Sequence, residues 1–297
     1  MHAGMAEFAD EVEEGGLGGL FPSSSDDEDE EVDEIKYDTY QRPCGKEELS
    51  LALVKRHHSL WGEFIYNAAR VVADYIDTGR IKIDKGCSVL ELGAGAGLPG
   101  VICALNGAGV VVLSDYGSEF DRGLVKAMDI NIEKFGDGCR MYSVPYIWGK
   151  AVEPLMVPSL RASPCATAAA SSGSNGKGTE EVGKCFDVVI MADCIFNRSE
   201  HKQLIWTLLH TLDKSNPSAK CVCSFSHHDP QYTQEDLNFL ELAKEAGLKC
   251  VCIGEEKRQS YPFVENDGMD ERRGWVYVYL ISWATHGAVT KTDGTAV

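Results

Sequence analysis

The sequence predicts an α/β domain of the doubly wound, Rossmann-like class, built on a seven-stranded and mostly parallel sheet. Short, continuously apolar runs alternate with longer segments whose apolar residues recur at helical spacing. Strands of this kind are buried on both faces, so helices are expected to cover both sides of the sheet. A hydrophobic content of 44% in 297 residues provides enough apolar side chains for a sizeable core.

The strands are expected where short apolar runs are bounded by polar or glycine-rich turns. In chain order they span residues 88–92, 110–114, 140–144, 186–191, 221–225, 248–253 and 275–281. Helical segments separate most of these strands, which favours parallel pairing. No helix separates the last two strands, so these are expected to pair antiparallel.

The helices are expected where apolar residues recur every three or four positions. In chain order they span residues 64–76, 99–106, 120–135, 200–212 and 235–246. In the third helix, Leu124, Met128 and Ile132 lie on one face because they are four residues apart. Thr233 is a candidate N-cap for the last helix.

The acidic charge is concentrated in residues 1–40. The whole chain has 46 acidic and 28 basic side chains and a net charge of −18, of which the first 40 residues supply −13 through 14 acidic side chains and one basic. Such a segment buries too little apolar surface to offset its chain entropy, so we expect a disordered tail. The folded domain is then expected at 41–285, with a low-complexity surface insertion at about 158–183 and a C-terminal tail at 286–297.

Composition also argues against several classes of partner and site. The negative charge disfavours nucleic acid, and no apolar run reaches the roughly 18 to 20 residues that span a bilayer. No signal peptide precedes the domain, which favours the cytoplasm. The eleven cysteines include no Cys-x-x-Cys pair, and the pairs Cys221/Cys223 and Cys250/Cys252 lie in expected strands. We expect buried reduced thiols and no metal site.

A glycine-rich turn, ELGAGAGLPG at residues 91–100, follows the first expected strand and opens a helix. Glycines there allow the backbone to approach a ligand at the carboxyl end of the sheet. Gly95, Gly97 and Gly100, with Asp115 twenty residues after Gly95, also satisfy the pattern of a dinucleotide-binding site. An NAD-linked oxidoreductase is therefore one alternative.

Further motifs favour another cofactor, S-adenosylmethionine. They are Leu60-Trp61-Gly62, Glu91 before the glycines, Ser114-Asp115-Tyr116, Asn131, Trp148-Gly149, Ala192-Asp193 and the segment 196–201. With these motifs, residues 40–282 resemble the seven-strand class of S-adenosylmethionine-dependent methyltransferases. Within that class the segments 226–230 and 262–273 are similar to the group that methylates the N-terminal amine and a lysine of translation elongation factor 1-alpha, formerly described as nicotinamide N-methyltransferase-like.

The resemblance implies a set of cofactor-binding residues and assigns no catalytic residue. Those implied to bind S-adenosylmethionine are Trp61, Gly93, Ala94, Gly95, Asp115, Trp148 and Ala192. Gly93, Ala94 and Gly95 would line the methionine moiety, and Asp115 would accept hydrogen bonds from the ribose hydroxyls. Trp148 would pack on or beside the adenine, with core packing as the alternative role for both tryptophans.

Methyl transfer to nitrogen mainly requires that a neutral amine be aligned with the methyl group. A lysine, with a pKa near ~10.4, must first lose a proton, whereas an α-amine near ~7.7 to 8.0 is already partly neutral. Asp193, Asn197 and His201 are candidates for orienting the amine, and His227 is a weaker one. His201 is equally compatible with a surface position in the first turn of a helix.

We therefore expect a cytoplasmic, monomeric protein N-methyltransferase with translation elongation factor 1-alpha as its substrate. A small-molecule N-methyltransferase, for example one acting on nicotinamide, is the alternative with the same chemistry. A cofactor-binding scaffold that acts through the acidic tail is a third class.

Overall fold

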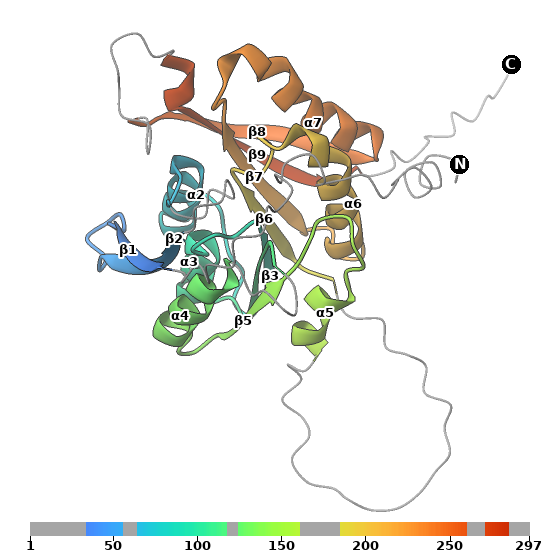
Figure 1. The fold of residues 1–297 in the computed structure, drawn as a ribbon. Coiled ribbons are helices and arrows are strands. Elements are labelled where there is room, and N and C mark those ends of the chain that lie inside the picture. Colours follow the sequence, from blue (N-terminus) through green and yellow to red (C-terminus); the bar gives the residue numbers. More distant parts are fainter. Residues whose placement is uncertain (1–33, 56–63, 118–123, 161–184, 260–270, 285–297) are drawn as a thin grey trace, which may run out of the picture.

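A seven-stranded sheet forms the centre of the molecule in the computed structural model, which describes residues 34–55, 64–117, 124–160, 185–259 and 271–284 (Figure 1). The strand order is β5-β4-β3-β6-β7-β9-β8. The strands are β3 (Ser88–Leu92), β4 (Val110–Asp115), β5 (Arg140–Pro145), β6 (Val188–Ala192), β7 (Lys220–Ser226), β8 (Leu248–Lys257) and β9 (Trp275–Trp283). The expected doubly wound sheet is confirmed.

Helices cover both faces of this sheet, as the apolar strands require. The α-helices are α2 (Asn67–Asp77), α3 (Leu98–Leu105), α4 (Val125–Phe135), α5 (Glu153–Leu160), α6 (His201–Thr211) and α7 (Thr233–Glu245). Apolar side chains of α2, α3 and α4 form one buried cluster with the sheet, and those of α5, α6 and α7 form another. The strand order reverses between β3 and β6, because β4 and β5 extend the sheet on one side of β3 and the later strands extend it on the other. A doubly wound fold binds its ligands at such a point.

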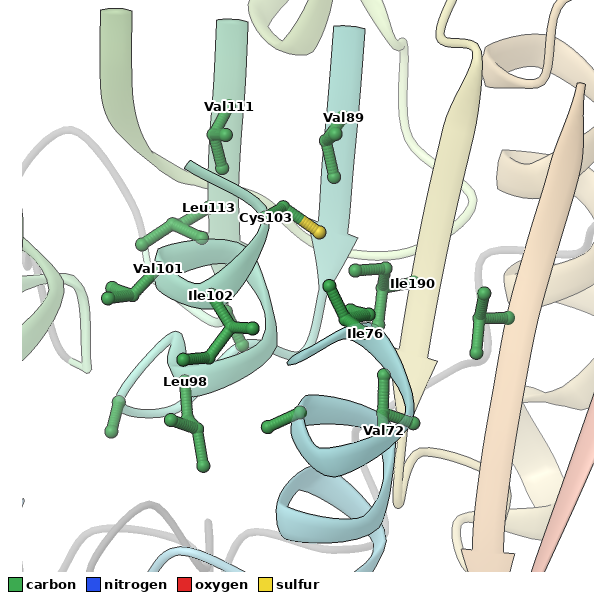
Figure 2. Close-up of a cluster of buried hydrophobic side chains, with 14 of the residues drawn as sticks. Val72, Ile76, Val89, Leu98, Val101, Ile102, Cys103, Val111, Leu113 and Ile190 are labelled. Atoms are coloured by element: carbon green, nitrogen blue, oxygen red, sulfur yellow. The ribbon is translucent and has the colours of Figure 1, made fainter. Parts of the chain in front are cut away.

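Strand β3 shows how one strand supplies both clusters. Its successive side chains point to opposite faces, so Val89 joins the cluster beneath α2 and α3 while Leu90 and Leu92 join the cluster beneath α6. Figure 2 shows Val89 with Ile76 of α2 and Ile102 of α3 in the first cluster. The β3 side chains are buried, so the packed strand holds the glycine-rich turn in place at the carboxyl edge of the sheet.

The last strands pair as expected from the missing helix between them. Strand β9 runs antiparallel to both β7 and β8, which makes β8 the outer strand of this half of the sheet. The edge position explains a correction to the cysteine prediction. Cys221 and Cys223 are buried in β7, but Cys252 of β8 is exposed and Cys250 is half-buried.

A hairpin precedes the domain and was not predicted. Strands β1 (Glu34–Tyr40) and β2 (Leu49–Lys55) pair antiparallel, so the folded chain begins inside the segment that was expected to be a disordered tail. Apolar side chains explain this, because Ile35 packs with Ala52 and Val54 against α4. Residues 1–33 lie outside the described part of the chain, as do the insertion at 161–184 and the C-terminal residues 285–297.

The helix starts differ by one to five residues from the expectation, and 3-10 turns precede two of them. Thr233 is the first residue of α7 and its hydroxyl donates to the carbonyl of Pro230, because a 3-10 turn at Pro230–Tyr232 leads directly into the helix. A similar turn at Arg198–Glu200 precedes α6. No helix within the described ranges is long and apolar enough to cross a membrane.

Candidate active site at the carboxyl edge of the sheet

The glycine-rich turn leaves open space in front of its backbone. Gly93, Gly95 and Gly97 all adopt the left-handed conformation, with φ of +63°, +53° and +72°. A Cβ on Gly93 would lie 2.8 Å from the Sγ of Cys194 and 3.2 Å from the Trp148 ring, whereas a Cβ on Gly95 would meet no atom within 4 Å. The turn is therefore packed against the protein at Gly93 and open at Gly95, where a ligand can approach the backbone.

Asp115 lies at the carboxyl end of β4, beside this turn. Its carboxylate accepts the N–H of Gly95 at 2.6 Å through Oδ2 and the N–H of Tyr116 at 2.6 Å through Oδ1. Burial raises the pKa of Asp115 to about 6 in spite of both hydrogen bonds. Each oxygen keeps a second lone pair, which suits a carboxylate that receives two further hydroxyl donors.

Glu91 is fully enclosed and supports the turn from below. Only 1% of the residue is exposed, and Oε2 accepts the N–H of Gly100 in the first turn of α3 at 2.7 Å. Burial raises the pKa of Glu91 to about 8. The glutamate that helped to distinguish the motif therefore holds the start of α3, and the nearby Asp115 carboxylate raises its pKa further.

Trp148 lies beside Gly93 of the turn, in the loop after β5. Its ring contacts Gly93 and packs on the cluster beneath α6. The loop is attached to α6 because the hydroxyl of Thr207 accepts the N–H of Gly149 at 2.9 Å. Ala192 ends β6 beside β3, so the structure brings Gly93, Ala94, Gly95, Asp115, Trp148 and Ala192 to one edge of the sheet. Trp61 lies outside the described residues.

Asp193 follows β6 at the same edge and carries a paired carboxylate. Its φ is +61°, an uncommon value for a residue other than glycine, and its N–H donates to the carbonyl of Ser224 in β7. The Nε2 of His228 lies 2.9 Å from both Asp193 oxygens. The rings of Tyr66 and Phe196 stand edge-on to the His228 ring, at centroid distances of 5.8 and 6.3 Å.

The other two predicted substrate residues occupy different positions. Asn197 is half-buried, and its side-chain oxygen accepts the hydroxyl of Ser199. His201 begins α6, as one reading expected, but it is buried and not at the surface. Its Nε2 lies 2.7 Å from the carbonyl of Ile195, its ring stands against Phe239, and burial lowers its pKa.

His227 and His228 turn to opposite sides at the end of β7. The Nδ1 of the buried His227 lies 2.9 Å from Asp236, which also accepts a hydrogen bond from Arg198. This arrangement ties the 3-10 turn before α6 and the end of β7 to α7. Sequence reasoning named His227 and missed His228, although adjacent residues at a strand end point to opposite faces.

The residues present fit S-adenosylmethionine. The open space at Gly95 admits a ligand to the backbone, and the remaining lone pairs of Asp115 match a vicinal diol. Trp148 provides an aromatic ring beside Gly93. Within the described residues no three His, Cys, Asp or Glu side chains gather in a way that could hold a metal ion.

Comparison with known proteins shows the family of this chain. A family model described as lysine methyltransferase matches residues 46–160. The protein N-terminal and lysine N-methyltransferase of Schizosaccharomyces pombe is 32% identical over 241 residues, which cover 81% of this chain and 84% of the relative. Enzymes with the same name are 30% identical in Candida albicans, over 82% of this chain and 88% of the relative, and 32% identical in Neurospora crassa, over 83% of each. The chain belongs to this lysine methyltransferase family and is an S-adenosylmethionine-dependent methyltransferase.

Proposed function

We propose that this enzyme methylates a protein amine, at the N-terminus, at a lysine, or at both, and that its substrate is translation elongation factor 1-alpha. The observation that carries the proposal is the similarity, over more than four fifths of the chain, to enzymes named protein N-terminal and lysine N-methyltransferases. Family membership argues against an NAD-linked oxidoreductase and against a cofactor-binding scaffold that acts only through the acidic tail.

The chemistry beside Asp193 supports an amine substrate. A carboxylate with aromatic rings nearby suits a cation, because both attract an ammonium group. Phe196 is 37% exposed at this point, so part of its ring is available to a ligand. A pyridine nitrogen such as that of nicotinamide has no proton to lose and gains nothing from a neighbouring acid–base pair.

The residues implied by the resemblance are proposed to divide the site between them. Gly93, Ala94 and Gly95 would line the methionine moiety of the cofactor, and Asp115 would bind the ribose hydroxyls. Trp148 would contact the adenine, with Trp61 and Ala192 completing the cofactor site. When bound, S-adenosylmethionine supplies an electrophilic methyl group, and the protein has to present a neutral amine to it.

The substrate side is proposed to involve Asp193, with Asn197 at its margin. The buried ring of His201 supports the turn after β6 through its bond to Ile195. The enzyme is proposed to act as a monomer in the cytoplasm, where elongation factors are found.

Methyl transfer to two candidate substrates tests the proposed function. Purified enzyme is incubated with methyl-labelled S-adenosylmethionine and either unmethylated elongation factor 1-alpha or nicotinamide. We expect label on the protein, and mass spectrometry of its peptides then locates the methyl group. Label on nicotinamide alone would contradict a protein substrate, and label on another protein of a lysate would replace the elongation factor.

A further inference from the structure

We propose that His228 is a catalytic residue that takes the proton from the substrate ammonium, and that Asp193 is the positioning residue that holds it. The inference rests on the proposed function, because it assumes an amine substrate. This differs from the expectation from the sequence, in which the Asp193 side chain itself orients the amine.

Exposure decides which of the two side chains an incoming amine meets. The side chain of Asp193 is 6% exposed, whereas that of His228 is 25% exposed. Both Asp193 oxygens lie 2.9 Å from the imidazole, so the carboxylate faces the ring. A substrate that arrives from solvent therefore contacts the histidine before the aspartate.

The hydrogen bond fixes the roles of the two ring nitrogens. Carboxylate oxygens only accept hydrogen bonds, so the Nε2 of His228 carries a proton. In the neutral ring the other nitrogen, Nδ1, is then the acceptor. The same arrangement, a carboxylate that fixes the tautomer of an imidazole, prepares histidine as a general base in other enzymes.

The surroundings hold this pair in one geometry. Tyr66 and Phe196 stand edge-on to the imidazole from two different segments. Asp193 keeps a left-handed backbone, with its N–H bonded to Ser224 of β7. Uncommon backbone conformations persist where the surrounding structure enforces them, and they cluster at functional sites.

The charged groups around His228 favour its protonated form. Among the described residues, Asp193 and Asp236 are acidic neighbours, Arg273 is a basic one, and Tyr66 contributes a phenol ring. Burial alone lowers the pKa of His228, but the charge and hydrogen bond of Asp193 outweigh burial and raise it above the ordinary value. A higher pKa makes the imidazole a stronger base for the substrate proton.

The step itself is a single proton transfer. The ammonium nitrogen of the substrate loses one proton to Nδ1 of His228, which leaves a neutral amine with a free lone pair and an imidazolium paired with Asp193. After methylation the imidazolium returns the proton to solvent. One proton is therefore released for each methyl group added to an ammonium substrate, and no other reactant is required.

Three variants distinguish a base from a structural residue. His228→Leu removes the imidazole, and His228→Gln keeps an amide donor of similar reach to Asp193 but has no basic nitrogen. Both should lower kcat on a lysine substrate by roughly 100-fold at pH 7.5. Both should recover toward the wild-type rate near pH 10, where the lysine is already partly neutral. His210→Gln, on the exposed side of α6, is the control and should behave as wild type.

A second readout does not depend on turnover. Histidine titrations by NMR in the cofactor-free enzyme should show that Asp193→Asn lowers the pKa of His228 and leaves that of His210 unchanged. Binding of S-adenosylhomocysteine by each variant shows that the fold is retained.

Two results would overturn the assignment. The first is a wild-type rate in His228→Gln, which would make the role of the imidazole structural. The second is a His228 pKa that is the same in Asp193→Asn and in wild type. Failure of the proposed function looks different, because the wild-type enzyme would then bind cofactor and methylate no protein at all. The NMR comparison still judges the Asp193–His228 pair in that case.

Discussion

The two halves of the sheet's carboxyl edge differ in whether backbone groups or side chains form the site. On the β3–β4 side the site is mostly backbone, with left-handed glycines and peptide N–H groups held by Glu91 and Asp115. On the β6–β7 side it is mostly side chains, with Asp193 and His228 between aromatic rings. The first half suits a ligand of fixed shape, and the second presents an acid–base pair of side chains to a substrate. Variants in the two halves should therefore affect different measurements.

The largest effect is expected from Asp115→Ala. A hydrogen bond to a charged group is worth about 1.5 to 3 kcal/mol, so loss of the two bonds to a ribose, about 3 kcal/mol at the lower end, should weaken cofactor binding by at least roughly 150-fold. The Gly95 N–H also loses its acceptor. Calorimetry with S-adenosylhomocysteine measures the dissociation constant.

Asp187→Ala is the matched control for Asp115→Ala. Asp187 also accepts a backbone N–H, that of Ser88, but it does so at the amino end of the sheet. This variant should lower the melting temperature and leave the dissociation constant unchanged. If Asp115→Ala keeps full affinity, Asp115 does not bind the ribose.

Asn131→Ala should weaken both the attachment of the hairpin and the binding of cofactor. The Asn131 side chain accepts the N–H of Ala52 and donates to the carbonyls of Ala52 and Ala96, so it joins β2 to the glycine-rich turn. Its removal leaves buried groups unpaired, which should cost about 3 kcal/mol of unfolding free energy. The loosened turn should also bind cofactor about tenfold more weakly.

The control for this coupling is Asn106→Ala. Asn106 caps α3 and donates to Asp77, away from the turn. Urea unfolding and calorimetry of both variants separate stability from affinity. Equal cofactor affinity in Asn131→Ala and wild type would show that the hairpin and the turn act independently.

How far the sequence could predict each half follows from the same contrast. The cofactor half depends on local pattern, so the glycines and Asp115 were identified from the residues at the ends of two consecutive strands. His228 was missed because its role depends on Asp193, 35 residues away, and on which way a strand end turns. The hairpin was missed for a related reason, since Ile35 and Val54 are buried only by packing on α4.

Phe196→Ala tests the side-chain half of the site without altering a titratable group. The exposed ring contacts His228, and an aromatic contact of this kind contributes about 1 kcal/mol. KM for the protein substrate should rise about fivefold while cofactor affinity stays constant. Tyr37→Ala, an exposed aromatic on the hairpin, is the control. A change in cofactor affinity would show that Phe196 belongs to the other half.

The smallest effect is a pH dependence of cofactor affinity. Burial raises the pKa of Asp115 from 3.8 to about 6, so a quarter of the sites carry the carboxylate at pH 5.5. If the ribose binds the charged form, affinity should fall by about fourfold between pH 7.5 and 5.5. Asp115→Asn has no titrating carboxyl and should bind weakly at both values.

The direction of that dependence separates the two halves. Because the folded-state pKa of Asp115 lies above its ordinary value, its ionisation weakens the unliganded fold as pH rises through about 6. Ribose donors offset this cost, so cofactor should stabilise the protein more at pH 7.5 than at 5.5. His228 also gains its proton in acid, but binding measured without substrate registers only the cofactor half. An affinity that rises on acidification would place the ribose away from Asp115.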